Sequence, residues 1–232
     1  MGRSISPTEN HLKAQLLNEL RRTKRISSST IIANELPLGV TGVRADLAVF
    51  SRYFTGIEIK SERDSLKRLA RQLPVYRDHF DRTILVLGSK HWAESRNIDL
   101  TGVELWIASG MTLKRVQQGI VTRKLNNQEN LLPPTIKKKF ATKATSTSNQ
   151  PKLFREAFIE RFGATSEAFW TNTLDRKIEA ADLAILSRFI DKREQSAALL
   201  ATIKKAQKEW LEELAQSVHS SSVSKKDSSS AK

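Results

Sequence analysis

The clearest alternation of apolar and polar positions in the chain lies between residues 44 and 61. Residues 44–50 and 55–61 each alternate with a period of two, and the polar segment 51–54 between them is typical of a tight turn. The apolar positions are Leu47, Val49, Ile57 and Ile59, which alternate with Asp46, Ala48, Glu58 and Lys60. Because successive side chains of a strand point to opposite faces, the pattern predicts a hairpin with one apolar and one charged face.

The segments around this hairpin predict helices and further strands. Residues 7–24 carry a leucine stripe at helical spacing after the N-cap candidate Thr8, and residues 28–36 read as a strand. Ser61 can cap a helix that starts at Glu62 and is kinked or split at Pro74. Further strands are expected at 82–88, 103–108, 113–116 and 120–123, with a short helix at 91–97. The order predicts an α/β fold, a mixed sheet flanked by helices.

The remainder of the chain divides by composition. Residues 126–151 are polar and predict a connector, residues 152–216 predict a small all-α C-terminal domain, and the Ser- and Lys-rich residues 217–232 predict a disordered tail. The helical domain carries no catalytic constellation, and its expected job is dimerisation as a homodimer or the choice of a protein partner. We expect residues 1–145 to fold without it.

Composition narrows the class of function. Residues 1–150 hold 25 Lys and Arg against 13 Asp and Glu, whereas residues 151–215 hold 11 of each, within a total net charge of +14. A basic surplus of this kind favours a polyanionic partner near the hairpin. No apolar run approaches about 18 residues, so a membrane span is not expected. The absence of cysteine excludes disulfides and zinc–thiolate sites and fits a cytoplasmic protein.

The charged face of the hairpin carries the candidate chemistry. Asp46 and Glu58 are equidistant from Arg52 in the turn, so a symmetric hairpin places their carboxylates opposite each other, where they repel. A divalent cation such as Mg²⁺, which favours carboxylates together with water and phosphate, relieves this repulsion. Lys60 lies two residues after Glu58 and projects from the same face. A solvated acid–base face without a metal is the alternative interpretation.

Asp46 followed by Glu58-Ile59-Lys60 resembles the D…(D/E)-X-K signature of the PD-(D/E)XK nuclease superfamily. Ala45 stands where the superfamily name has proline. Arg68, Gln72 and Tyr76 follow at helical spacing, as in the small RecB-like and resolvase-like nucleases. The resemblance covers roughly residues 26–125. It implies a restriction-endonuclease-like fold over residues 1–125, with Mg²⁺ as cofactor and Mn²⁺ as an expected substitute.

The resemblance also implies roles for individual residues. The expected metal ligands are Glu35, Asp46, Glu58 and the carbonyl group of Ile59, and the expected catalytic residues are Asp46, Glu58, Lys60 and Gln72. Glu35 could instead be an edge residue that faces water, and Gln72 an ordinary surface glutamine. The expected nucleic-acid contacts are Arg44, Arg63, Lys67, Arg68, Arg71 and Tyr76.

These features predict a metal-dependent DNA endonuclease that hydrolyses phosphodiester bonds in repair, recombination or mobile-element biology. Its partner is then DNA, held mainly through the phosphate backbone. A non-catalytic nucleic-acid-binding protein that keeps the nuclease fold is the first alternative. An interaction protein that works through its helical domain is the second.

Overall fold

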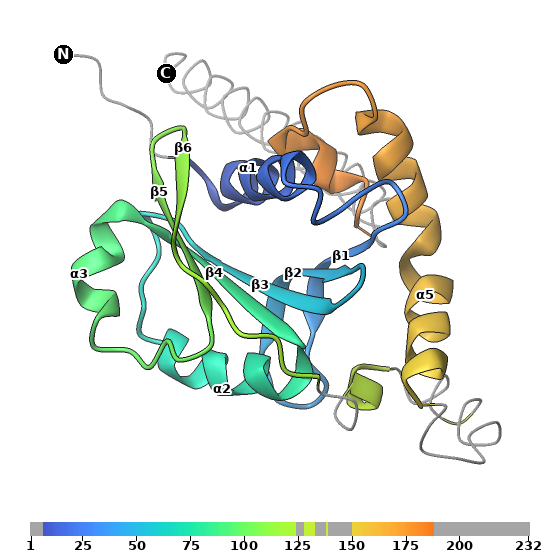
Figure 1. Cartoon of the computed structure of the whole chain (residues 1–232), viewed down its shortest axis with the longest axis horizontal. Coiled ribbons are helices and arrows are strands. Elements are labelled where there is room, and N and C mark those ends of the chain that lie inside the picture. The colour runs from blue at the N-terminus through green and yellow to red at the C-terminus, as the bar shows by residue number, and fades with distance from the viewer. Residues whose placement is uncertain (1–6, 124–127, 133–137, 139–149, 188–232) are drawn as a thin grey trace, which may run out of the picture. The chain divides into compact units, whose positions relative to one another are not determined.

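A computed structural model describes residues 7–123, 128–132, 138 and 150–187 of the 232-residue chain. Its centre is a six-stranded sheet in the order β1-β2-β3-β4-β5-β6, with helices on both faces (Figure 1). The elements are α1 (Glu9–Arg22), β1 (Ile31–Pro37), β2 (Arg44–Phe50), β3 (Phe54–Lys60), α2 (Leu69–His79), β4 (Arg82–Gly88), η1 (Ser89–His91), α3 (Trp92–Ser95), β5 (Glu104–Ser109), β6 (Thr112–Gln117), η2 (Gln128–Leu131), α5 (Gln150–Thr173) and η4 (Ala180–Ala184).

The sheet is mixed. Strands β1, β2 and β3 pair antiparallel, β3 pairs parallel with β4 and β4 with β5, and β5 and β6 form an antiparallel pair. Parallel neighbours need a crossover connection, and α2 supplies it between β3 and β4. The predicted α/β class, a mixed sheet flanked by helices, is therefore confirmed.

The hairpin of β2 and β3 has the predicted register. Leu47 pairs with Ile57 and Val49 with Thr55, so the same register continued by one residue sets Asp46 opposite Glu58. Leu47 and Ile57 belong to a core that α1 covers, together with leucines of that helix. Thr8 caps α1 as predicted, because its side chain accepts a hydrogen bond from the His11 N–H. Glu58 lies on the other face of the hairpin, where its side chain accepts a hydrogen bond from Tyr76 of α2.

Some local predictions were wrong. Helix α2 begins at Leu69 rather than at Glu62, because Asp64 Oδ2 accepts hydrogen bonds from the Ser61 N–H and hydroxyl and closes a separate turn. Pro74 lies inside this helix without splitting it. Residues 118–123 form no strand; two of their amides, those of Ile120 and Thr122, bond instead to the Gly102 and Asp81 carbonyls.

Helix α5 packs on the outer edge of the sheet. The Ser166 hydroxyl accepts from the Ile32 N–H at 2.9 Å, and the Trp170 indole donates to the Thr30 carbonyl at 2.7 Å. Figure 1 shows α5 beside β1, the edge strand. Gly163 lies within α5 and does not end it.

The expectation of a separate helical domain over residues 152–216 differs from this arrangement. One compact unit extends to residue 188, and a second begins at residue 189. Several predicted segments lie outside the described residues: the helices expected after residue 187, the tail at 217–232 and most of the 126–151 connector. None of the helices in the described ranges is long and apolar enough to cross a membrane.

Gly56 in β3 offers a test of this packing. A Cβ added there would lie 2.2 Å from the ring of Phe80, a buried residue. We therefore expect Gly56→Ala to lower the free energy of unfolding by about 2–3 kcal/mol, or the Tm by roughly 5–10 °C. Gly163→Ala is the matched control, because its Cβ meets only Ile159 at 3.5 Å and alanine favours a helix. Equal thermal melting of the two variants would contradict the packing.

Candidate active site

Three carboxylates from different elements converge where β3 ends and β2 begins. Glu9 comes from the first turn of α1, Glu35 from β1 and Asp46 from β2. One oxygen of each lies within 4.8 Å of the others. We call these three residues the carboxylate cluster. Like charges at this spacing repel, so the cluster forms only with cations close by.

Cationic side chains border the cluster. The Lys13 ammonium, 1% exposed, lies 2.6 Å from Glu9 and 2.7 Å from Glu35, and it also donates to Asn34 at 3.0 Å. Burial alone lowers the pKa of Lys13, but its hydrogen bonds to Glu35 and Glu9 outweigh this and raise that pKa. Arg44 reaches the other oxygen of Glu35 at 2.5 Å. Lys13 is therefore a resident counter-charge for the cluster.

Glu35 has an unusual backbone. Its φ is +58°, in the left-handed region that residues other than glycine rarely adopt. Such strain costs on the order of 1–3 kcal/mol and is found most often at functional sites. It accompanies a side chain that joins the cluster and pairs with Lys13 and Arg44.

Asp46 links the cluster to β3. Its Oδ2 accepts a hydrogen bond from the Ile59 N–H at 2.6 Å, which ties the carboxylate to the strand that carries Glu58 and Lys60. Burial, followed by the charge of Glu58, raises the pKa of Asp46 to about 8. The predicted conflict between the two opposed carboxylates is thus present in the structure.

Glu58 and Lys60 form a buried pair beside the cluster. They are 1% and 6% exposed, and the Lys60 ammonium donates to one Glu58 oxygen while the Tyr76 hydroxyl donates to the other. Burial and then the charge of Glu58 raise the pKa of Tyr76 well above its usual range. Glu58 adjoins the cluster without being one of its members.

Helix α2 and the turn before it present two different faces. Arg63, Lys67, Arg68 and Arg71 are exposed, as a nucleic-acid contact requires. Tyr76 is fully buried, so its predicted role as a nucleic-acid contact does not fit; it supports Glu58 instead. Gln72, one turn before Tyr76, is 8% exposed, and its Oε1 has no hydrogen-bond partner in the described part of the chain.

Comparison with known proteins places the chain in a family. Residues 3–140 match the family described as bacteriophage P4 protein cII. The chain belongs to this family. The matched range contains every residue of the carboxylate cluster, the Glu58–Lys60 pair and α2, and it ends before α5.

Two individual proteins are similar to the chain. Protein cII of Enterobacteria phage P4 is 34% identical over 122 residues, an alignment that covers 51% of this chain and 46% of the phage protein. The chain thus matches about half the length of that relative. A solved structure of a protein of unknown function from Silicibacter pomeroyi has 15% identity and a TM-score of 0.43, over 71% of this chain and 91% of that one.

The donor set of this cII-family protein fits a hard divalent cation. Carboxylates are the protein ligands that Mg²⁺ prefers, and Asp46 and Glu35 already approach each other. Burial, and after it the charge of Glu58, raises the pKa of Asp46, and a bound cation would oppose both effects. The described structure brings together Glu35, Asp46 and the backbone of Ile59, while Glu58 is held by Lys60 and Tyr76.

Two site residues were missed by sequence reasoning. Glu9 is indistinguishable from an acidic residue placed to suit the dipole of α1, and Lys13 lies next to the apolar stripe of that helix. Their i,i+4 spacing was the one available signal, because it predicts an ion pair. Their approach to Glu35 and Asp46 depends on tertiary packing.

Proposed function

We propose that this cII-family chain is a metal-dependent DNA endonuclease with a restriction-endonuclease-like fold. The observation that carries the proposal is the approach of Asp46 to Glu35 and Glu9 beside the buried Glu58–Lys60 pair. Carboxylates that repel one another destabilise the fold unless a cation binds between them. Next to a buried lysine and a basic surface, such carboxylates favour a site for a metal ion and a phosphodiester. Similarity to a phage protein favours mobile-element biology over repair or recombination.

The residues that would hold Mg²⁺ are Asp46 and Glu35, and Glu58 and the Ile59 carbonyl are the further ligands that the resemblance implies. Bound there, the ion supplies Lewis acidity and charge stabilisation at the phosphate. Glu58 could turn to the site by releasing its bonds to Lys60 and Tyr76, which would free the Lys60 ammonium at the same time. Mn²⁺ offers the same preference for oxygen ligands and is expected to substitute.

Lys60 is the proposed catalytic residue that moves or stabilises charge. Its ammonium lies within the buried part of the site and is already paired with a carboxylate. From this position the ammonium can orient the attacking water or stabilise negative charge on the phosphate. Once it has lost a proton of its own, the Lys60 amine can also accept the proton of that water. Gln72 has a free amide oxygen for orienting the same water.

The exposed cations of the 63–71 segment would hold the DNA. Arg63, Lys67, Arg68 and Arg71 lie at the surface, on the same side of the sheet as Glu58, and Arg44 is exposed beside Glu35. Contacts of this kind neutralise phosphates, so binding should weaken steeply with salt and depend little on base sequence.

The variant Lys60→Met should separate chemistry from binding. It keeps much of the side-chain stem but removes the ammonium, so we expect metal-dependent cleavage to fall by roughly 10²-fold or more. Binding of Mg²⁺ should persist, because removal of the Lys60 ammonium also frees Glu58 as a ligand. Single-turnover cleavage and calorimetric Mg²⁺ titration measure the two effects. Lost metal binding without a separate chemical defect would indicate that Lys60 only supports the fold.

A non-catalytic nucleic-acid-binding protein is the second candidate. It is favoured by the full engagement of Glu58, whose two oxygens already accept from Lys60 and Tyr76. In that case the carboxylates would be structural, and the basic surface alone would account for DNA binding.

A plasmid assay distinguishes the two candidates. The full chain is incubated with supercoiled plasmid and Mg²⁺ or Mn²⁺, beside an EDTA control, and then with linear, branched and single-stranded DNA. Metal-dependent nicking that Lys60→Met removes supports the endonuclease. Salt-sensitive DNA binding with no cleavage of any substrate in either metal would support the non-catalytic candidate.

A further inference from the structure

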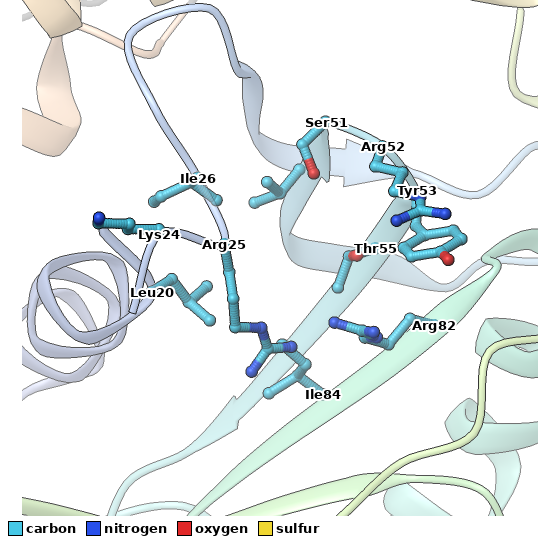
Figure 2. A pocket seen from close by; sticks show the side chains of 11 residues that line it. Leu20, Lys24, Arg25, Ile26, Ser51, Arg52, Tyr53, Thr55, Arg82 and Ile84 are labelled. Carbon is cyan, nitrogen blue, oxygen red and sulfur yellow. The ribbon is translucent and has the colours of Figure 1, made fainter. Parts of the chain in front are cut away.

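A second polar feature lies at the opposite end of β3 from the carboxylate cluster. A cavity of about 230 Å³ opens between the end of α1, the turn joining β2 to β3, and the start of β4. Its charged lining residues are all cations, and its walls include Leu20 and Ile84 (Figure 2). We call it the arginine pocket, after Arg25, Arg52 and Arg82.

Arg82 is the central cation of the arginine pocket. Its Nε is buried and has no hydrogen-bond partner among the residues that the structure describes. Burial, followed by the charge of Arg25, lowers the pKa of the Arg82 guanidinium. A guanidinium offers five N–H donors, and leaving one buried and unmet carries a desolvation penalty. The described residues therefore supply no acceptor for this N–H group.

The neighbouring arginines add further positive charge to the pocket. Figure 2 shows the side chains of Arg25 and Arg82 extending toward each other. Arg25 is balanced by Glu104, through bonds of 2.6 and 2.9 Å. No ion pair with a described carboxylate is found for Arg52 or Arg82, and both guanidiniums lie 5.4 Å from the centre of the Tyr53 ring. Tyr53 thus contacts two guanidiniums that form no ion pair with a described carboxylate, although the charge of Glu104 acts on Arg82.

We propose that the arginine pocket binds a phosphate monoester, carried by a free nucleotide or by the end of a nucleic-acid strand. Guanidinium forks match phosphate oxygens in pairs, and a dianion balances the two arginines that form no ion pair with a described carboxylate. The volume lies below the range of about 300–1,000 Å³ usual for drug-sized ligands, so it suits the phosphate and a small part of its substituent.

The pocket is separate from the candidate active site. Thr55 lines the pocket and Lys60 ends the same strand, so five residues, or about 17 Å of strand, separate them. Ile84 and Val49 of the pocket belong to the α1 face of the sheet, whereas Glu58 contacts Tyr76 of α2. This inference consequently does not rest on the nuclease proposal.

Calorimetric titration of the full chain in EDTA tests the proposal without catalysis. The probes are inorganic phosphate, thymidine 5′-monophosphate and thymidine. We expect the monophosphate to bind and thymidine not to bind. Arg82→Met should weaken monophosphate binding at least tenfold, about 1.4 kcal/mol. The matched control is Arg96→Met, because Arg96 is an exposed arginine that lies over Trp92 at 5.6 Å, far along the chain from the pocket.

A second variant and a second pair of probes complete the test. Arg52 is exposed in the turn, so Arg52→Gln should fold normally and weaken binding even if Arg82→Met does not fold. Matched oligonucleotides with a 5′-phosphate or a 5′-hydroxyl identify the source. Tighter binding of the phosphorylated strand than of the monophosphate assigns a strand end, and the reverse assigns a free nucleotide. Equal affinity for thymidine and its monophosphate, or unchanged binding in Arg52→Gln, would overturn the proposal.

Discussion

Replacing Asp46 by asparagine is expected to abolish metal-dependent cleavage and, at the same time, to stabilise the metal-free protein. The change removes the ionisable group, and with it the negative charge that Asp46 carries above its pKa, but keeps an oxygen that can accept the hydrogen bond from the Ile59 N–H. Cleavage should fall below detection in a plasmid assay, since a cation then loses its central ligand. DNA binding should remain, because the exposed arginines and lysines are untouched.

The stability effect has a defined pH dependence. The folded-state pKa of Asp46 is about 8, whereas an unfolded aspartate titrates near 3.8. Between these values the folded state holds a proton that the unfolded state has released, so the stability of the metal-free protein falls as pH rises from about 4 to 8. The slope has an upper limit of about 1.4 kcal/mol per pH unit.

Urea denaturation in EDTA at pH 5 and pH 8 measures this effect. Asp46→Asn should be about as stable as the parent at pH 5 and more stable at pH 8. Asp78→Asn is the control, since Asp78 is exposed on α2, outside the cluster. Added Mg²⁺ should stabilise the parent at pH 8 but not Asp46→Asn. Retained cleavage, or an unchanged pH slope in the variant, would remove Asp46 from the proposed site.

The sequence was informative where the chemistry follows from local geometry. Counting outward from Arg52 predicts that Asp46 faces Glu58, and the observed pairing of Leu47 with Ile57 agrees. An alternating hairpin has few other arrangements, because a shift of one residue would turn its apolar side chains to the polar face. The central strand β4 was likewise recognisable from its continuous apolar run.

Positions that depend on long-range packing could not be predicted in this way. Helical spacing groups Arg68, Gln72 and Tyr76 on adjoining faces, but it does not say which of them turns inward. In the structure Gln72 and Tyr76 are buried and Arg68 is exposed. Glu9 and Lys13 reach the site only because α1 packs against the hairpin.

The role of α5 was also hidden, because composition suggested a boundary before it. Its aromatic side chains are buried against the sheet: Phe154, Phe158 and Phe162 join a core with Phe54, and Phe169 and Trp170 join the core beneath α1. The ring centres of Phe154 and Phe158 each lie 5.1 Å from that of Phe54. A polar connector in the sequence therefore did not mark the end of the folded unit.

A truncation experiment follows from this packing. Residues 1–145 should fail to fold as a stable monomer, whereas residues 1–187 should keep the fold of the full chain and any metal-dependent cleavage. Five buried aromatic side chains of α5, at about 1.5–3 kcal/mol each, contribute on the order of 10 kcal/mol. The free energy of unfolding of such domains is only about 5–15 kcal/mol, so the loss of α5 is comparable with the total stability.

Loss of α5 has a second consequence at the edge of the sheet. Ser166 covers the outward N–H and carbonyl of Ile32 in edge strand β1, and Trp170 covers the Thr30 carbonyl. An uncovered edge is a template for pairing with other chains, so residues 1–145 should aggregate. Size-exclusion chromatography and circular dichroism of both fragments measure this. A folded, monomeric 1–145 fragment that still cleaves DNA would show that α5 is dispensable and that the earlier boundary at the connector is the correct one.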